Sequence, residues 1–231
     1  LTSISHDLRT PLAAIMGSAG TLREYGKDLD AETKADLLRS IQDESERLNR
    51  FIANLLDMTR LESGAVVPNR AAHDVRDIVG SALQRAAKVL AKHRVEVDLA
   101  PGLPMIDVDP VLFEQVLFNL LDNAAKYAPP DTTVSVQGRR HDGDHRVRLH
   151  VCDEGEGIPA DDLERIFDKF HRAQKGDRVR AGTGLGLAVC RGFIEAMGGT
   201  ITAGNRDDRP GAMFTMTLPA AKGASAMDEA A

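Results

Sequence analysis

Apolar residues recur every three or four positions along the first 25 residues, which is the spacing of an amphipathic helix. The pattern predicts a helix that ends near Tyr25, just before Gly26. His6 falls on the side away from the apolar stripe, Asp7 is its neighbour, and Thr10 follows one turn later. An imidazole, a carboxylate and a hydroxyl therefore share an exposed patch. This patch is either a reactive site or an ordinary solvated helix face.

A second helical pattern runs from about residue 32 to residue 63, after a short loop at residues 27–31. Its apolar positions form two heptad rows, namely Ile41, Leu48 and Leu55, and Leu37, Phe51 and Met58. Two long helices with a short connection form an antiparallel hairpin, but a single hairpin cannot cover so wide a stripe. Two hairpins can do so as a four-helix bundle, so we predict a homodimer. The alternative is that the hairpin packs on the rest of its own chain.

The pattern changes after Gly64, where Pro68 helps to mark a domain boundary. We expect a dimerisation hairpin at 1–66, a second domain at 67–220 and a disordered tail at 221–231. In the second domain we predict helices at 75–91, 110–127, 160–167 and 185–197, and strands at 95–99, 105–108, 132–139, 145–153, 200–205 and 212–218. Asp142-Gly143 would form the turn between two of these strands. The fold class is α+β, a helical hairpin followed by an α/β sandwich with one sheet and helices on one face.

Composition narrows the class of protein. The 231 residues carry a net charge of −6, which argues against a general nucleic-acid binder. Cys152 and Cys190 sit in apolar runs, so we expect buried free thiols in a reducing compartment. No apolar run approaches the ~20 residues needed to span a bilayer. Because a helix is already under way at the first residue, we expect a piece of a longer protein.

One face of the helix predicted at 110–127 carries two amides and an ammonium group. Asn119 and Asn123 are four residues apart, and Lys126 follows within a turn. Oxygen ligands of this kind, together with phosphate oxygens, suit a Mg²⁺ ion. Paired amides on a solvated helix face are the competing interpretation.

Two glycine-containing stretches flank strands and helices of the second domain. Asp153 leaves an apolar strand where it would enter a pocket, and its carboxylate can accept a hydrogen bond from an amino group such as that of adenine. Residues 182–187 (GTGLGL) precede a helix, where exposed backbone N–H groups favour phosphate. The competing interpretations are an acidic turn and a glycine-rich hinge. The charged, non-periodic segment 171–182 is predicted to be a mobile lid.

Together these motifs resemble the catalytic core of the sensor histidine kinases. The resemblance rests on residues 5–11 (SHDLRTP, the H box), 119–127 (NLLDNAAKY, the N box), 153–157 (DEGEG), 167–170 (FDKF, the F box), 182–187 (GTGLGL) and 211–214 (GAMF). Within the family the chain is most similar to the KdpD-type potassium-responsive kinases, through residues 55–60 (LLDMTR), 79–84 (VGSALQ), 167–170 and 199–206 (GTITAGNR).

The resemblance implies a fold shared with the DNA gyrase and MutL-type ATPases, with ATP and Mg²⁺ as cofactors. His6 would be phosphorylated, Asp7 would orient it, and Thr10 would support dephosphorylation of a response regulator. Mg²⁺ would be held by Asn123 and Asn119. The implied nucleotide-binding residues are Asn119, Asn123, Lys126, Tyr127, Asp153, Gly155, Gly157, Ile158, Phe170, Arg172, Gly182, Thr183, Gly184, Leu185, Gly186 and Leu187. The implied partners are a second copy of the chain and the receiver domain of a response regulator, in the cytoplasmic portion of a membrane-anchored sensor.

Two other classes of protein remain as alternatives. An ATP hydrolase of the same fold should carry a water-activating Glu one turn before the Mg²⁺-binding asparagine, where this chain has Asn119. A scaffold with a degenerate nucleotide site should lack some of the motif residues, whereas His6, Asn123 and Asp153 are all present.

Overall fold

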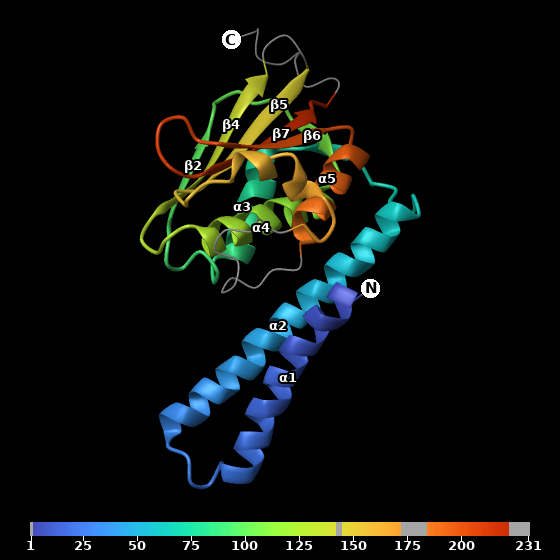
Figure 1. The fold of residues 1–231 in the computed structure, drawn as a ribbon. Helices are drawn as coiled ribbons and strands as arrows, with labels where there is room; N and C mark the ends of the chain where they lie inside the picture. Colours follow the sequence, from blue (N-terminus) through green and yellow to red (C-terminus); the bar gives the residue numbers. More distant parts are fainter. Residues whose placement is uncertain (1, 142–144, 172–183, 222–231) are drawn as a thin grey trace. The chain divides into compact units, whose positions relative to one another are not determined.

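The chain forms two compact units, residues 1–59 and residues 60–231. The computed structural model describes residues 2–141, 145–171 and 184–221, and for residues 2–7 it describes the helical backbone only (Figure 1). The predicted turn at Asp142-Gly143, most of the predicted lid and almost all of the predicted tail lie outside the described residues. None of the described helices is both long enough and apolar enough to cross a lipid bilayer.

The first unit is the predicted helical hairpin. Helix α1 spans Thr2–Tyr25 and helix α2 spans Ala31–Glu62, so the last residues of α2 belong to the second unit. Asp30 caps α2, because its Oδ1 accepts a hydrogen bond of 2.6 Å from the Thr33 backbone N–H. The sharp turn between the helices is thus fixed by a local side chain.

The hairpin leaves most of its apolar stripe uncovered. Among its described side chains, Phe51 is the one large hydrophobic residue that is fully buried. The large hydrophobic side chains that remain exposed in this unit are Leu12, Met16, Tyr25, Leu38, Ile52 and Leu56. The two helices of the hairpin therefore do not cover their own apolar stripe.

The second unit is built on a five-stranded sheet with the order β2-β4-β5-β7-β6. Its strands are β2 (Arg94–Leu99), β4 (Thr133–His141), β5 (Arg146–Cys152), β6 (Thr200–Asn205) and β7 (Ala212–Pro219). Strand β2 pairs in parallel with β4, and the other neighbours are antiparallel. Alternate residues of β5 and β7 are buried, as expected for strands that have one face on the core.

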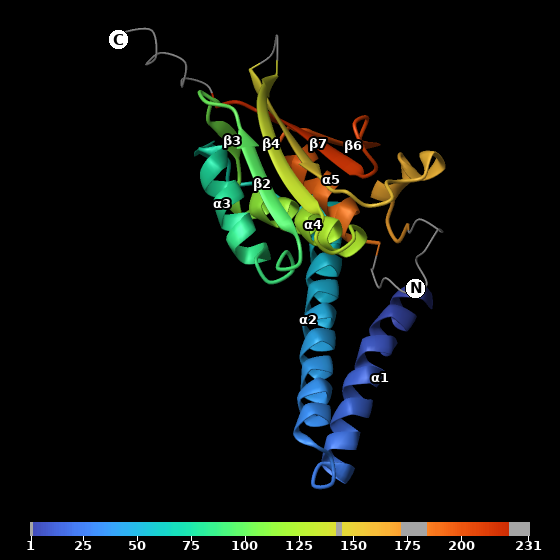
Figure 2. The same cartoon turned by 90° about the vertical axis from the view of Figure 1, so that its left-hand side faces the viewer.

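Three helices cover one face of this sheet (Figures 1 and 2). They are α3 (Val75–Ala86), α4 (Pro110–Tyr127) and α5 (Gly186–Ala196). Asp109 caps α4 by accepting hydrogen bonds from the N–H groups of Val111 and Leu112, and Pro110 is the first helical residue, as predicted. The predicted α/β sandwich is confirmed, and α4 lies at its centre with α3 on one side and α5 on the other.

Three local predictions were wrong. Residues 160–167 form two short 3₁₀ turns, η1 (Ala160–Asp162) and η2 (Arg165–Phe167), in place of one helix. Helix α3 ends at Ala86 rather than near residue 91, and hydrogen-bonded turns continue to His93. The sequence analysis also missed β1 (Ala71–His73), which pairs with β3 (Ile106–Val108) in a separate two-stranded sheet. Both cysteines are buried free thiols, as expected.

Candidate ATP-binding site

The carboxylate of Asp153 is the most buried charged group of the candidate site. It follows β5, is 4% exposed, and its Oδ1 accepts hydrogen bonds from the N–H groups of Gly155 (2.8 Å) and Ala212 (3.1 Å). Burial raises the pKa of this carboxyl, and the two backbone hydrogen bonds oppose the rise. Because Oδ1 is used by the backbone, Oδ2 is the oxygen through which Asp153 can accept a hydrogen bond from a ligand.

The turn after Asp153 is packed so closely that it requires glycine. A Cβ on Gly155 would lie 3.0 Å from the Tyr127 carbonyl oxygen at the end of α4. Gly157 has a φ of +79°, a left-handed conformation that other residues rarely adopt. The turn at residues 153–158 therefore lies against the last turn of α4, and two sequence-predicted parts of the site meet here.

Helix α4 turns its apolar side to the core and its amides to the other side, as predicted. Its fully buried residues include Leu117, Leu120, Leu121 and Ala124, whereas Asn119, Asn123 and Lys126 are partly exposed. Lys126 Nζ donates a hydrogen bond of 3.0 Å to the Tyr127 hydroxyl and lies 4.6 Å from the centre of that ring. A cation and an exposed aromatic ring thus stand together at the carboxyl end of α4.

Asn119 carries a buried polar atom without a satisfactory partner. Its Nδ2 has no hydrogen-bond partner in the described part of the chain. The side chain faces the Cys190 thiol of α5, and burial raises the pKa of that thiol to about 12, so it stays neutral and bonds only weakly. This Nδ2 atom is a hydrogen-bond donor, so it can serve an acceptor atom but cannot ligate a metal ion. The amide oxygens of Asn119 and Asn123, which are partly exposed and one turn apart on α4, are the groups that fit a phosphate-bound Mg²⁺ ion.

The second glycine stretch is described only in its last part. Gly184 has a φ of +67°, and its carbonyl accepts a hydrogen bond of 2.9 Å from the Phe170 N–H. Leu185 is fully buried, Gly186 begins α5, and Leu187 is half-buried in its first turn. The first turn of α5 offers backbone N–H groups at its amino end, as a phosphate cradle requires.

Several predicted site residues cannot be placed. Arg172, Gly182 and Thr183 lie outside the described residues, as do the side chains of His6 and Asp7. The backbone of α1 at His6 and Asp7 is helical, as predicted, and Thr10 is exposed on the same helix.

The sequence analysis missed a polar cluster that surrounds the Asp153 turn. Glu154 accepts a hydrogen bond of 3.0 Å from the Thr133 N–H and pairs with Arg209 at 2.9 Å. Arg206 donates a hydrogen bond of 3.4 Å to the Asp153 carbonyl and pairs with Asp208 at 2.9 Å. The Thr133 hydrogen bond, and then Arg209, hold the pKa of Glu154 below its usual value. These residues come from the ends of β4, β5 and β6, so no local sequence pattern could have joined them.

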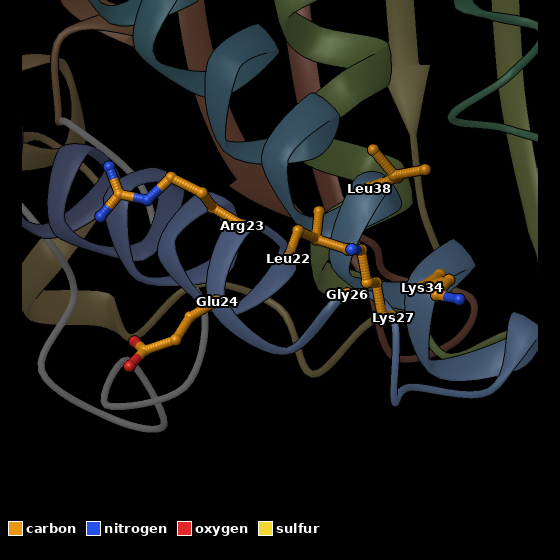
Figure 3. A pocket seen from close by; sticks show the side chains of 7 residues that line it. All are labelled: Leu22, Arg23, Glu24, Gly26, Lys27, Lys34 and Leu38. Atoms are coloured by element: carbon orange, nitrogen blue, oxygen red, sulfur yellow. The ribbon is translucent and has the colours of Figure 1, made fainter.

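The first unit contains a separate pocket of about 510 Å³ at the loop end of the hairpin (Figure 3). Its lining residues are Leu22, Arg23, Glu24, Gly26, Lys27, Lys34 and Leu38. Leu22 is sixteen residues after His6, which is about 24 Å along a helix at 1.5 Å per residue. The pocket is therefore distinct from the patch around His6. Within the described ranges, no group of three His, Cys, Asp or Glu residues is placed to hold a metal ion.

A buried carboxylate after a strand, an amide face on one helix and a glycine-led second helix together define an ATP-binding α/β sandwich. Residues 108–222 match the family described as "Histidine kinase-, DNA gyrase B-, and HSP90-like ATPase", and residues 1–64 match the "His Kinase A (phospho-acceptor) domain". The chain belongs to the histidine kinases. The fold class predicted from the sequence is confirmed.

Curated relatives agree with the predicted subfamily. The sensor protein KdpD of Clostridium acetobutylicum is 40% identical over 220 residues, which are 95% of this chain and 24% of that protein. KdpD of Escherichia coli is 40% identical over 221 residues, again 95% of this chain and 24% of the relative. The chain thus spans about a quarter of the length of these relatives, and the resemblance to KdpD-type kinases is confirmed.

Solved structures support the same fold. The Acinetobacter baumannii histidine kinase AdeS is 27% identical with a TM-score of 0.71, over 93% of this chain and 98% of that one. Full-length ShkA in complex with AMPPNP is 28% identical with a TM-score of 0.69, over 97% of this chain and 46% of that one.

Proposed function

We propose that this chain is the catalytic core of a two-component sensor kinase that phosphorylates His6 with ATP and passes the phosphoryl group to an aspartate of a response regulator. The observation that carries the proposal is the buried Asp153 carboxylate, whose Oδ1 is held by two backbone N–H groups, in a chain that also bears a phosphoacceptor hairpin. The domains would be residues 1–66 and 67–220.

The adenine end of ATP would bind at Asp153. Its Oδ2 would accept a hydrogen bond from the exocyclic amino group, and the glycine turn would let the base approach the backbone. Lys126 and Tyr127, at the adjoining end of α4, would line the nucleotide. The phosphates would lie toward residues 182–187, where the amino end of α5 favours negative charge.

The amides of Asn123 and Asn119 would hold Mg²⁺ together with the phosphates. Both residues are partly exposed and one turn apart on α4, which supports a shared ligand at this place. The ion would neutralise charge on the transferring phosphoryl group. Beyond that, phosphoryl transfer needs little from the protein except positioning, so α4 and α5 act by orienting the nucleotide.

His6 would attack the γ-phosphorus of ATP through one unprotonated ring nitrogen. A nitrogen–phosphorus bond would form while the bond to the leaving ADP oxygen breaks. Asp7 would accept a hydrogen bond from the other ring N–H, which fixes the tautomer and stabilises the positive charge that develops on the ring.

The partners would be a second copy of the chain and a response regulator. The exposed apolar stripe of the hairpin supports pairing with a second copy. The solved complex of the histidine kinase ThkA with the response regulator protein TrrA has the same fold, with a TM-score of 0.70 over 94% of this chain and 60% of that one at 22% identity. By its resemblance to the KdpD-type potassium-responsive kinases, the whole protein would be a membrane-anchored sensor that responds to potassium, with this chain on the cytoplasmic side.

The deciding experiment exposes the purified protein to γ-labelled ATP. We expect acid-labile, base-stable label on the wild type and none on His6→Gln, which should still bind ATP. Label on His6→Gln at the wild-type rate would refute His6 as the acceptor. Rapid release of free phosphate by that variant would instead favour the ATP hydrolase, and failure of the wild type to bind nucleotide would favour the scaffold.

A further inference from the structure

The side chain of Asn205 is bonded to both polar backbone atoms of Ile158. Asn205 Nδ2 donates a hydrogen bond of 2.8 Å to the Ile158 carbonyl, and Asn205 Oδ1 accepts one of 2.7 Å from the Ile158 N–H. The Asn205 side chain therefore makes the pair of backbone hydrogen bonds with Ile158 that a residue of a neighbouring β-strand would make. The two residues are 47 positions apart, so the contact ties the end of β6 to the turn that follows Asp153.

The absence of a side chain at Gly157 leaves room for this contact. A Cβ at Gly157 would lie 2.6 Å from Asn205 Oδ1, closer than real Cβ contacts come. The left-handed φ of +79° at Gly157 turns the following Ile158 peptide toward Asn205. The glycine thus serves the approach of Asn205 as well as the turn itself.

The same stretch of chain also holds the other end of the turn. Arg206, the next residue, donates a hydrogen bond of 3.4 Å to the Asp153 carbonyl, and its N–H donates one of 3.0 Å to Gly211. Within the turn, Asp153 Oδ1 accepts from Gly155. The first half of the turn is therefore held by Asp153 and Arg206, and the second half by Asn205.

We propose that Asn205 is a positioning residue for the nucleotide, which sets the shape of the turn at residues 153–158 and thereby the affinity for ATP. It acts through the Gly157-Ile158 peptide, which borders the site on the Asp153 side. The inference rests on the proposed function, since it requires that Asp153 bind the base. A role limited to general stability of the β6 end is the alternative.

The two roles differ in what they change. If Asn205 positions the turn, its loss weakens ATP binding but leaves the transfer step intact once ATP is bound, because His6 and the phosphates are not touched. The KM for ATP then rises while the rate of autophosphorylation at saturating ATP is kept. A purely structural role lowers the Tm without this split.

The test compares Asn205→Ala with Asp74→Ala. Asp74 caps α3 by accepting from the Arg76 N–H, so its removal weakens the same unit without touching the Asp153 turn. The dissociation constant is measured by titration with a fluorescent ATP analogue in the presence of Mg²⁺, beside the Tm and the autophosphorylation rate. We expect a roughly tenfold weaker affinity for Asn205→Ala with a saturated rate within about twofold of wild type. Asp74→Ala should lower the Tm and leave the affinity unchanged.

A conservative variant sharpens the result. Asn205→Asp keeps an oxygen that can accept from the Ile158 N–H but sets its other oxygen against the Ile158 carbonyl, so its affinity should fall below that of the wild type. Wild-type affinity for Asn205→Ala, or an equal loss in Asp74→Ala at equal Tm, would overturn the positioning role. If the wild type itself bound no nucleotide, the proposed function would fail instead, so the two failures are distinguishable.

Discussion

The two units of the chain differ in where their apolar and charged groups lie. In the hairpin, Leu38, Ile52 and Leu56 are exposed, and Phe51 is the one fully buried large hydrophobic side chain among those described. In the ATP-binding unit, the helices and the sheet bury a continuous aliphatic core and even a carboxylate, Asp153. The ATP-binding unit thus completes its own core, whereas the hairpin depends on another surface.

This difference suggests that assembly depends on the hairpin and nucleotide binding on the other unit. The ATP-binding unit can keep a precise site because that site is supported by a packed interior and by hydrogen bonds from several strands and helices. The hairpin carries the proposed phosphoacceptor on a two-helix element, and in the proposed dimer a second copy would complete its core. Assembly and chemistry are therefore separable by mutation, and the predictions below test that separation.

The largest effect is expected for Leu56→Glu on dimerisation. Leu56 is 56% exposed in the single chain and would be buried twice in a symmetric dimer, so a charge there opposes association at two places. We expect the dimer dissociation constant to rise by about 1,000-fold, measured by analytical ultracentrifugation, while ATP binding stays within about twofold.

Arg50→Glu is the matched control, since it places a carboxylate at an exposed position on the side of α2 away from the apolar stripe. Its dimer should resemble that of the wild type. A monomeric wild type, or equal loss of the dimer in both variants, would contradict the idea that the stripe forms the interface.

The next effect is that of Asp153→Asn on nucleotide binding. Asparagine can still accept the hydrogen bonds of Gly155 and Ala212 with its oxygen, but its NH₂ group then faces the amino group of adenine. We expect ATP affinity to fall by about 100-fold, with the dimer unaffected, because a buried donor is left facing a donor. Calorimetric titration checks this, and wild-type affinity in the variant would remove Asp153 from the site.

The same carboxyl predicts an unusual pH dependence. Burial raises the pKa of Asp153 above its ordinary value of 3.8, so the folded protein holds this proton more tightly than the unfolded chain. The free energy of unfolding of the wild type, relative to Asp153→Asn, should therefore fall as pH rises from about 4 through the raised pKa. Nucleotide affinity should change in the opposite direction, because the ionised form accepts the hydrogen bond. Urea unfolding at several pH values measures the first trend.

A smaller effect, confined to the hairpin, is expected for Thr10→Ala. Thr10 is exposed one turn after His6, about 6 Å along the helix, so it is too far to take the proton of His6 but can orient a water toward a docked phosphoaspartate. We expect dephosphorylation of the purified regulator to slow by about tenfold, with autophosphorylation near normal. A parallel loss of both activities together with a lower Tm would show that Thr10 only supports the helix before Pro11.

Elements were predicted correctly where the residues that determine them are neighbours in the sequence. Helix α4 was predicted with its bounds because Asp109, Pro110 and the prolines after Ala128 lie next to its ends. Strand β1 was missed because Ala71–His73 is short and lacks β-branched residues, and its partner lies more than thirty residues away. Residues 160–167 carry helix-like apolar spacing over too few turns to hold a helix, so 3₁₀ turns form.

The candidate site shows the same contrast. Asp153 and Asn119 were identified because each sits on one periodic element at the point where its pattern changes. Asn205 and Arg206 were not, because their partners are brought to them by the pairing of β5 with β7 and of β6 with β7. Contacts of this kind depend on the completed sheet, and no spacing in the chain encodes them.

The smallest effect concerns the segment that enters the ATP-binding unit. Asp109 uses one oxygen to cap α4, and its other oxygen accepts a hydrogen bond of 2.9 Å from the Asn69 N–H, just before β1. In the variant Asp109→Asn, the remaining side-chain oxygen can still cap the helix, but the new NH₂ group cannot accept from Asn69. The substitution should therefore remove the link between this segment and α4 while keeping the cap.

We expect Asp109→Asn to lower the free energy of unfolding of the ATP-binding unit by about 1 kcal/mol, a Tm shift of about 2–4 °C. The loss of a negative charge near a helix amino end contributes part of this. Asp74→Asn is the control, because it makes the same change at the cap of α3, where the side chain contacts only Arg76 among the bonds described. The excess of Asp109→Asn over Asp74→Asn then measures the Asn69 hydrogen bond. If that excess is zero, the Asn69 hydrogen bond does not stabilise the unit. If ATP affinity also falls more than about twofold, the ATP-binding unit is less independent of the segment before it than its packed core implies.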